Sequence, residues 1–527
     1  MTALAAAGAG VAGPSRSQAT HAAGLDPYTR TLDRRRLAHL LRRTTMGAHP
    51  SDVAIHVGKS AEQVVDTLLA DATDPARLPL PPKPNWADIP MPDRKTSSSE
   101  AVKQFNQDNR DWLLAFRSDW MGWFHKGGLR EKMTLFWHNH FVAGAEVYTL
   151  AAMAYRYVSL LREHALGGFK TMVAGIGKTP AMLVYLNGDK NVKDAPNENY
   201  ARELLELFTM GPVDAQGQSN YSQTDVQQLA RALTGWTVNY ETHTAVFDVA
   251  EFDDGVKTIL GRSGAYGYND VVDLLFEERG DQIAWFVCAE LYREFVHETL
   301  DPAVVAAMAE LFKNSQFEIE PVVRALLTSA HFYETRFIGA RIKSPIELIA
   351  GFMRDLGYAP PADMLRTFYE AAGELDQDLL DPPDVSGWPG YHTWLSTNSL
   401  PVRWSTTDDL LFAGRSGQPL DLVGWARSFA APSDPFALAV AIAEHLLAVP
   451  LDELDLEESD EPFDGDLIGH PIPEGILTGP PVHVRALAKT FLNGVPWYEW
   501  ALEESGSNAV LLNYVQLIAQ FPEFNLA

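Results

Sequence analysis

The chain has 527 residues, of which 46% are hydrophobic and 10% aromatic, so it can bury a sizeable core. Its formal net charge of -27 at pH 7 argues against nucleic acid or an anionic membrane as the main partner, because proteins bind both through basic patches. The single cysteine, Cys288, excludes an intramolecular disulfide and any site built from several cysteines.

The N-terminal segment is rich in alanine and glycine and lacks the positively charged start and the strong apolar core of a signal peptide. We therefore expect residues 1–25 to form a disordered tail and residues 26–527 to form a single helical domain. No apolar stretch is long enough to cross a bilayer, so we expect no membrane-spanning segment. Without an evident export signal, the sequence favours a cytoplasmic location.

Two further segments break the helical pattern. Residues 78–97 are rich in proline, which predicts an extended linker that crosses the surface. Residues 452–466 are strongly acidic and do not match a calcium-binding EF-hand loop, so we expect a solvated insertion there.

The remaining patterns indicate a mainly α protein, a multi-helix orthogonal bundle-like domain with one small β-hairpin. The hairpin is predicted at residues 244–260, which alternate between apolar and polar residues and contain the turn signal Asp253-Asp254-Gly255. A strong helix start is predicted at residues 344–347, where Ser-Pro-Ile-Glu combines a capping box with proline at the first helical position.

Two histidines lie close together in FWHNHF at residues 136–141. On a regular helix, residues two positions apart point about 200° apart. His138 and His140 could therefore share one ion only if the helix ended at His138 and the chain became extended. The alternative is that both histidines make structural hydrogen bonds within a group of aromatic side chains.

The segment PNENYARELLELFTMG at residues 196–211 predicts an amphipathic helix. Its polar face carries Glu198, Arg202 and Glu206 four residues apart, with Glu203 beside them. Carboxylates on such a face suit a divalent metal or a general base, and an arginine can orient a carboxylate or an anionic substrate. The following YSQTDVQQLARALTGW predicts a second helix that ends at a glycine.

A segment rich in tryptophan, proline and glycine occupies residues 381–404, called here the aromatic segment. Its residues Trp388, Tyr391, Trp394 and Arg403 are candidates for lining a pocket, and an aromatic ring can stack on a sugar ring. The alternative is a loop that is held in place by its own aromatic side chains.

Taken together, these motifs resemble the bacterial family called domain of unknown function 1800. The resemblance extends from about residue 30 to the C-terminus. Its motifs are LLRRTTMGAHPSDV, FWHNHF, TPAMLVYLNG, NENYARELLELFTMG, YSQTDVQQLARALTGW, RIKSPIELI, PPDVSGWPG and LIAQFPEFNLA.

The resemblance implies a helical fold but no reaction, because the activity of the family is unassigned. Members are often exported and are commonly encoded beside sulfatase-like proteins, which implies such a protein as a partner. The family pattern also leads us to expect a histidine where this chain has Phe252. That departure weakens any metal site carried over from the family.

Two hypotheses of function follow. In the first, the protein is a metal-assisted hydrolase or a related enzyme, with His138, His140 and Glu198 holding a divalent metal and with Glu203, Glu206 and Arg202 acting on the substrate. In the second, it is a non-catalytic binding or scaffold protein that docks a sulfatase-like partner on the aromatic segment. The enzyme requires the helix carboxylates to lie beside the histidines in a concave pocket.

Overall fold

The structure, a computed structural model, describes residues 24–412, 419–451, 454 and 482–527. The described residues form a mainly α-helical fold with two small two-stranded antiparallel sheets, which confirms the predicted fold class. The expected N-terminal tail lies outside the described residues apart from Gly24 and Leu25, and so does the expected acidic insertion apart from Leu454.

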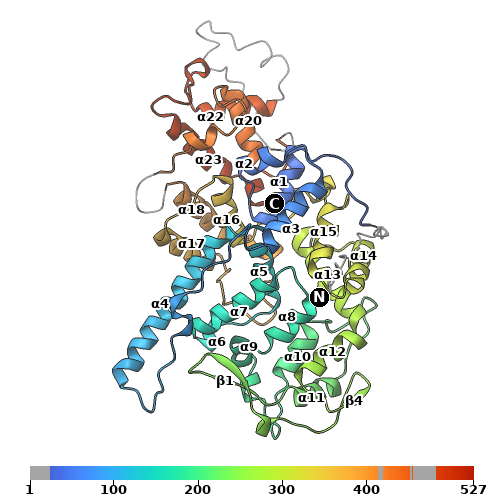
Figure 1. Cartoon of the computed structure of the whole chain (residues 1–527). Helices are drawn as coiled ribbons and strands as arrows, with labels where there is room; N and C mark the ends of the chain where they lie inside the picture. Colours follow the sequence, from blue (N-terminus) through green and yellow to red (C-terminus); the bar gives the residue numbers. More distant parts are fainter. Residues whose placement is uncertain (1–23, 413–418, 452–453, 455–481) are drawn as a thin grey trace, which may run out of the picture.

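The first third of the chain supplies the helices at the centre of the molecule, with α5 between the two ends (Figure 1). These helices are α1 (Arg34–Thr45), α2 (Pro50–His56), α3 (Ala61–Thr73), α4 (Ser99–Phe124), α5 (Gly128–His140), α6 (Ala145–Tyr148), α7 (Ala151–Glu163), α8 (Phe169–Ile176) and α9 (Pro180–Tyr185).

The middle third forms the end of the molecule that is lowest in Figure 1, together with the helices beside it. Its helices are α10 (Asn199–Glu206), α11 (Gln223–Ala232), α12 (Tyr268–Glu278), α13 (Gly280–Phe295), α14 (Pro302–Asn314) and α15 (Ile319–Thr328). Its strands are β1 (Trp236–Asn239), β2 (Thr244–Phe247), β3 (Lys257–Ile259) and β4 (Arg262–Gly264).

The last third begins beside α4 and ends with α20, α22 and α23 at the opposite end of the molecule (Figure 1). Its helices are α16 (Pro345–Asp355), α17 (Ala362–Glu374), α18 (Ser399–Leu411), α19 (Val423–Ala426), α20 (Pro435–Leu446), α22 (Val482–Leu492) and α23 (Ser507–Ala519). Buried apolar side chains from Leu25 to Phe524 form one contiguous core.

Helix α5 is buried from Leu129 to His138, including its charged residues. A charge buried without a partner is strongly unfavourable, so each must be paired. Glu131 accepts hydrogen bonds from Arg162 on α7 and from the Trp120 indole N–H at 3.0 Å. Lys132 forms ion pairs with both Glu294 and Glu347. Helix α5 therefore fixes the positions of its neighbours through charge as well as through apolar contact.

The proline-rich segment 78–97 is irregular apart from one 3-10 turn, Asn85–Asp88. Trp86 in that turn stacks on Trp112 of α4, with ring centroids 6.2 Å apart. The segment thus lies against the long helix α4, whose start projects from the body of the molecule (Figure 1).

Strand pairing differs from the single hairpin predicted at residues 244–260. Strand β2 pairs with the preceding β1, and β3 pairs with the following β4, so the predicted segment contributes one strand to each of two hairpins. The predicted turn residue Asp253 instead accepts a hydrogen bond from Arg231 at 2.7 Å, and its backbone carbonyl accepts one from Lys257. Side-chain pairing at this corner therefore separates two hairpins.

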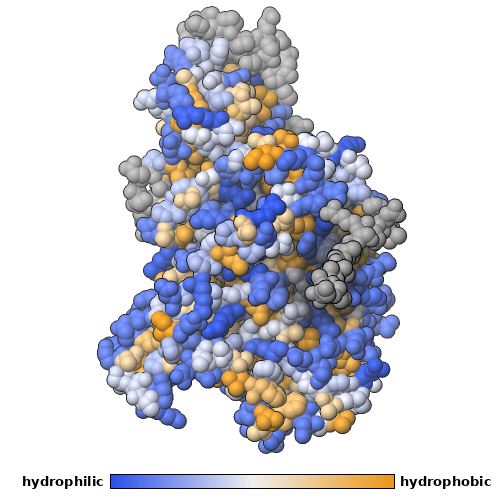
Figure 2. All heavy atoms as spheres, viewed as in Figure 1, coloured by the Kyte–Doolittle hydropathy of each residue, from blue (hydrophilic) through white to orange (hydrophobic). Residues whose placement is uncertain are grey.

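Apolar residues are exposed at the end of the molecule that carries β1 and β2. The exposed fractions are 43% for Phe247 and 76% for Val249. Figure 2 shows hydrophobic residues gathered at this end of an otherwise largely hydrophilic face.

The predicted helix start at residues 344–347 is confirmed. Ser344 caps α16 in a capping box with Glu347, and Pro345 occupies the first turn. Among the described residues, none of the helices combines the length and the apolarity that a bilayer crossing requires.

The buried ion pairs of Lys132 predict a large effect on stability. Lys132→Met should lower the free energy of unfolding by about 3–5 kcal/mol, because it leaves Glu294 and Glu347 with only one of the two cations that they share, Arg341. Denaturant unfolding of the full chain measures this change.

Lys313→Met is the matched control, since Lys313 pairs with Asp281 at the surface, where an ion pair contributes about 0–1 kcal/mol. Equal losses of stability in the two variants would show that the buried ion pairs of Lys132 contribute no more to the free energy of unfolding than a surface ion pair does.

Candidate functional site

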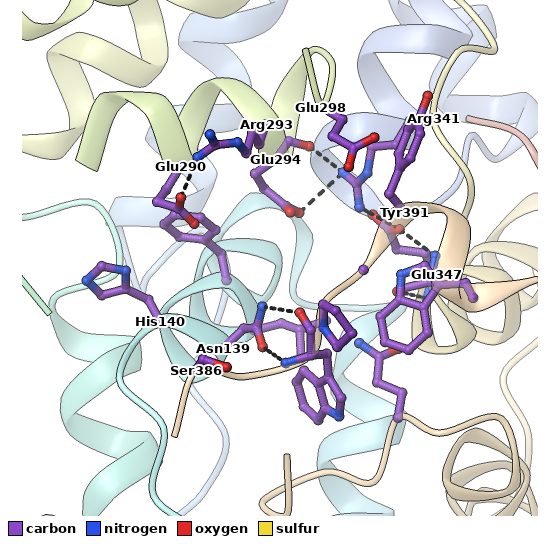
Figure 3. A pocket seen from close by; sticks show the side chains of 18 of the residues that line it. Asn139, His140, Glu290, Arg293, Glu294, Glu298, Arg341, Glu347, Ser386 and Tyr391 are labelled. Atoms are coloured by element: carbon purple, nitrogen blue, oxygen red, sulfur yellow. Dashed lines mark hydrogen bonds and ion pairs between the residues drawn. The ribbon is translucent and has the colours of Figure 1, made fainter. Parts of the chain in front are cut away.

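A cavity of about 520 Å³ lies where segments distant in sequence meet. Its walls come from α5, from α13, from the start of α16 and from the aromatic segment, and Leu207 contributes just after α10 (Figure 3). Its volume falls within the range of roughly 300–1,000 Å³ that is usual for small-molecule sites. It is therefore the best candidate for a functional site in the described part of the chain.

The FWHNHF motif holds three separate segments around this cavity. Helix α5 continues through His140, so the helix does not end at His138 as a shared ion would have required. The two imidazoles therefore point in different directions, and each bonds to a different part of the chain.

His138 is fully buried, and both of its ring nitrogens have partners. Nε2 accepts a hydrogen bond from the Leu380 N–H at 3.1 Å, which leaves Nδ1 as the donor to the Tyr157 hydroxyl at 3.0 Å. Tyr157 in turn donates to the Phe141 carbonyl at 2.6 Å. Burial, with a smaller effect of Arg117, lowers the pKa of His138 to about 3, so the ring is neutral at pH 7.

Asn139 holds the aromatic segment against α5. Its Oδ1 accepts from the Trp388 N–H at 2.7 Å, and its Nδ2 donates to the Trp388 carbonyl at 3.4 Å (Figure 3). Gly387 has a positive φ of 85°, and a Cβ there would lie 2.4 Å from Asn139 Oδ1. Only glycine therefore permits this close contact.

His140 lines the cavity and bonds α5 to Phe208, just after α10. Its Nε2 donates to the Phe208 carbonyl at 3.1 Å. Burial lowers the pKa of His140 to about 4, so this ring is also neutral at pH 7.

The carboxylates of α10 pair with other groups than the histidines. Glu198 accepts from Arg202 at 3.0 Å and from Gln223 at 2.8 Å, and Arg202 also donates to Gln223. Glu206 accepts from the Tyr221 hydroxyl at 3.0 Å. This polar face therefore joins α10 to α11 and to the residues before it.

Glu203 is the remaining carboxylate of the α10 face. It is partly buried, and burial, with the neighbouring Glu206, raises its pKa above the ordinary value. Glu203 does not line the cavity, so it lies apart from the histidine that does.

The aromatic segment divides into residues that line the cavity and one that does not. Trp388, Tyr391 and Trp394 line the cavity, and the Tyr391 hydroxyl donates to the Ala340 carbonyl at 3.3 Å. Arg403 is instead buried in α18, where it donates to Asn525 at 3.2 Å and to the Lys343 carbonyl at 2.8 Å. It therefore anchors the C-terminal residues.

Helix α13 contributes a row of side chains to the cavity that sequence analysis missed. Phe286, Glu290 and Glu294 are four residues apart, so they share one face of the helix, and all three line the cavity. The signal was present in the sequence as acidic residues at every fourth position of an otherwise apolar helix. It resembles an ordinary solvated helix face until the opposing wall is known.

Glu290 and Glu294 pair with different cations. Glu290 accepts from Arg293 at 2.7 Å, yet burial dominates and raises the pKa of Glu290 above its ordinary value. Glu294 uses Oε1 for its ion pairs with Lys132 and Arg341. Within the described chain, Oε2 of Glu294 has no hydrogen-bond partner. Figure 3 shows both side chains projecting from α13 to the same side.

Lys132, Glu294, Arg341 and Glu347 form an ion-pair quartet in the cavity wall. Arg341 donates to both oxygens of Glu347 at 2.7 Å, and the Ser344 N–H donates to Oε2 of Glu347 at 2.9 Å. Burial alone would raise the pKa of Glu347, but Arg341 and Lys132 outweigh it and hold the pKa well below its usual range. Glu347 thus has no oxygen left for a ligand.

The proposed metal ligands do not form a metal site. His138 has no free nitrogen, and Glu198 is bonded to Arg202 and Gln223. Within residues 24–412, 419–451, 454 and 482–527, no three His, Cys, Asp or Glu side chains are arranged to hold an ion. The residues present therefore do not fit the divalent metal that the sequence suggested.

Fold and cavity together define a mainly α-helical protein with a polar, aromatic-walled pocket at the junction of distant segments. The family model described as Protein of unknown function (DUF1800) matches residues 39–525. The chain therefore belongs to that family, as the sequence motifs indicated. No curated protein and no solved structure matches the chain.

The buried neutral imidazole of His138 predicts an acid-sensitive fold. The pKa of His138 is about 3 in the folded protein and about 6.5 in the unfolded chain. Below pH 6.5 the unfolded state therefore binds a proton at His138 that the folded state does not bind. The contribution of neutral His138 to the free energy of unfolding is fully present above pH 6.5 and decreases as the pH falls towards 3. At pH 5, His138 alone should lower the free energy of unfolding by about 2 kcal/mol.

Denaturant unfolding between pH 7 and pH 5 measures this loss. His138→Gln should show a shallower pH dependence than the wild type, whereas His392→Gln, which changes an exposed residue, should keep the wild-type slope. Identical slopes in all three proteins would exclude His138 as the source.

Proposed function

We propose that the protein is a hydrolase that uses general acid–base catalysis in the cavity, with Glu290 as the acid and Glu294 as the base. One observation carries this proposal: the two carboxyl groups lie one helical turn apart on α13 and line the same cavity, and each has one oxygen without a donor among the described residues. A carboxyl group with a raised pKa beside a carboxylate held by cations suits a pair of catalytic acid and base.

Glu290 suits the role of the acid. Its raised pKa brings the protonated carboxylic acid closer to neutral pH, where a general acid is most effective. The side chain is 36% exposed, so the cavity gives a reactant access to it.

Glu294 suits the role of the base. Its ion pairs with Lys132 and Arg341 are formed by the charged carboxylate, and Lys132 is itself almost completely buried. These contacts fix Oε1, while Oε2 remains available to accept a proton from a water molecule. The quartet thus supports one catalytic group and holds it in place.

The chemistry follows from these two roles. A water molecule attacks the scissile centre while Glu294 accepts a proton from it. Glu290 donates a proton to the oxygen or nitrogen that leaves. The two carboxyl groups then return to their starting states by exchanging protons with solvent.

A second candidate is a non-catalytic binding protein for a sulfatase-like partner. The pairing of the α10 carboxylates with Arg202, Gln223 and Tyr221 favours it, because these groups have a structural role. The cavity favours the enzyme, because a flat docking surface needs no enclosed acid–base pair.

Removal of either carboxyl group tests the proposal. The full chain is assayed against 4-nitrophenyl esters, phosphates, sulfates and glycosides, and kcat/KM is measured on the class that it hydrolyses. Glu290→Gln and Glu294→Gln should each lower kcat/KM by about 10²–10⁴-fold, the usual contribution of a general acid or base.

Glu310→Gln is the control, because Glu310 is exposed on α14 and does not line the cavity. Hydrolysis that survives in both cavity variants would contradict the proposal. A folded wild-type protein that hydrolyses no class, and that binds a sulfatase-like protein equally well with and without the two substitutions, would favour the binding protein.

A further inference from the structure

We infer that the substrate of the cavity is a neutral carbohydrate, bound with the face of a sugar ring against Phe286 or Tyr391. This inference rests on the proposed hydrolase function and names its substrate class. It follows from the polar atoms that the cavity leaves unpaired and from the aromatic rings beside them.

The first observation is an unpaired donor in the wall. Gln377 is 3% exposed and lines the cavity. Its Oε1 accepts from the Ile346 N–H at 2.8 Å, which fixes the orientation of the amide. Within the described chain, Nε2 has no acceptor. The amide N–H group is therefore open to the cavity, where an oxygen atom of a ligand would accept a hydrogen bond from it.

The second observation is a set of unpaired acceptors on the opposite wall. Oε2 of Glu290 and Oε2 of Glu294 have no donors among the described residues, and Glu298, at the next position in the same series, is exposed at the rim. Carboxylate oxygens accept hydrogen bonds from hydroxyl groups. A cavity that offers both a donor and several acceptors suits a ligand with many hydroxyl groups.

Charge balance disfavours an ionic ligand. With Glu290 protonated, as its role requires, the cations Lys132, Arg293 and Arg341 in the lining are balanced by the carboxylates of Glu294, Glu298 and Glu347. An anionic group would find the cations Lys132 and Arg341 already saturated and would face the unpaired carboxylate oxygens. An ammonium group would meet Arg293, which is 44% exposed beside Glu290.

Aromatic rings provide the remaining contact. Phe286 and Tyr391 are the cavity aromatics that are only partly buried, so part of each ring is open to a ligand. Phe286 lies one turn before Glu290 on the same face of α13. A ring held on Phe286 would therefore lie beside the acid and the base.

The reaction is the hydrolysis of a glycosidic bond. The bond between the anomeric carbon and the leaving oxygen breaks as Glu290 protonates that oxygen, and the oxygen of a water molecule bonds to the anomeric carbon. Glu294 accepts the proton that the water loses. The products are a free sugar and an alcohol or a second sugar, and no oxidant or further reactant is consumed.

Calorimetry on the full-length Glu290→Gln protein tests binding separately from hydrolysis, because glutamine replaces the acid with a neutral group and leaves the ion-pair quartet unchanged. The probes are 4-nitrophenyl glycosides of glucose, galactose, mannose and xylose, with 4-nitrophenyl glucuronide as the anionic probe and benzyltrimethylammonium as the cationic probe. At least one neutral glycoside should bind, with a Kd at least tenfold lower than that of either charged probe. Tighter binding of a charged probe, or no binding of any neutral glycoside, would overturn the inference.

Variants of the wall identify the contacts. Gln377→Glu keeps the acceptor for the Ile346 N–H and removes the free donor, and it should weaken glycoside binding by about tenfold. Phe286→Leu should weaken it by a similar factor, whereas Phe286→Tyr keeps an aromatic ring and should bind like the parent protein. Tyr391→Leu gives a second aromatic deletion on the other wall.

If Gln377→Glu, Phe286→Leu and Tyr391→Leu all bind the glycoside as tightly as the parent protein, the glycoside does not contact this cavity and the inference is overturned. The two proposals fail in different ways. If an ester or phosphate is hydrolysed in a way that depends on Glu290 and Glu294, and no glycoside binds, the proposed hydrolase function is supported and the carbohydrate substrate is excluded. If a glycoside binds but the wild-type protein does not hydrolyse it, the carbohydrate ligand is supported and the proposed hydrolysis is excluded.

Discussion

The burial of Lys132 is the constraint on which the cavity depends. An ammonium group that is 1% exposed requires compensating charge, and here it has carboxylates from two other helices, Glu294 on α13 and Glu347 on α16. These three helices must meet at one point for the pairing to form. Arg341 completes the charge balance, so the quartet both closes one wall of the cavity and orients a carboxylate that faces into it.

Local features of the fold could be predicted from the sequence, because they depend on short-range periodicity and capping. The helical class and the start of α16 at Ser344 are of this kind. Partners distant in sequence could not be predicted, since Lys132 and Glu347 are 215 residues apart and neither residue carries a local sign of burial. The strand pairing predicted for residues 244–260 was wrong for a related reason. Asp253 has the sequence pattern of a turn residue, but its carboxylate accepts a hydrogen bond from Arg231.

The candidate site shows the same limit. Sequence analysis selected the histidines of FWHNHF and the carboxylates of α10, because they form compact polar motifs, and the structure gives their polar atoms other partners. His138, Asn139 and His140 connect α5 to Leu380, to Trp388 and to Phe208. The motif therefore forms part of the cavity wall and bonds the neighbouring segments to it. Glu290 and Glu294 were not predicted as site residues, because acidic residues spaced four apart on a helix are also typical of a solvent-exposed face. Only the position of the opposing wall distinguishes the two cases.

The placement of Glu290 and Glu294 on one rigid helix has a consequence for how such a site can diversify. Their separation is set by the pitch of α13 and is independent of any loop. The wall that faces them includes residues 385–394, a segment whose only helix is the 3-10 turn Tyr391–Trp394 and which Asn139 bonds at Trp388. Substitutions in that segment can reshape what the pocket accepts while the spacing of the two carboxyl groups stays constant. In the proposed hydrolase, reaction and selectivity are thus encoded in separable parts of the chain.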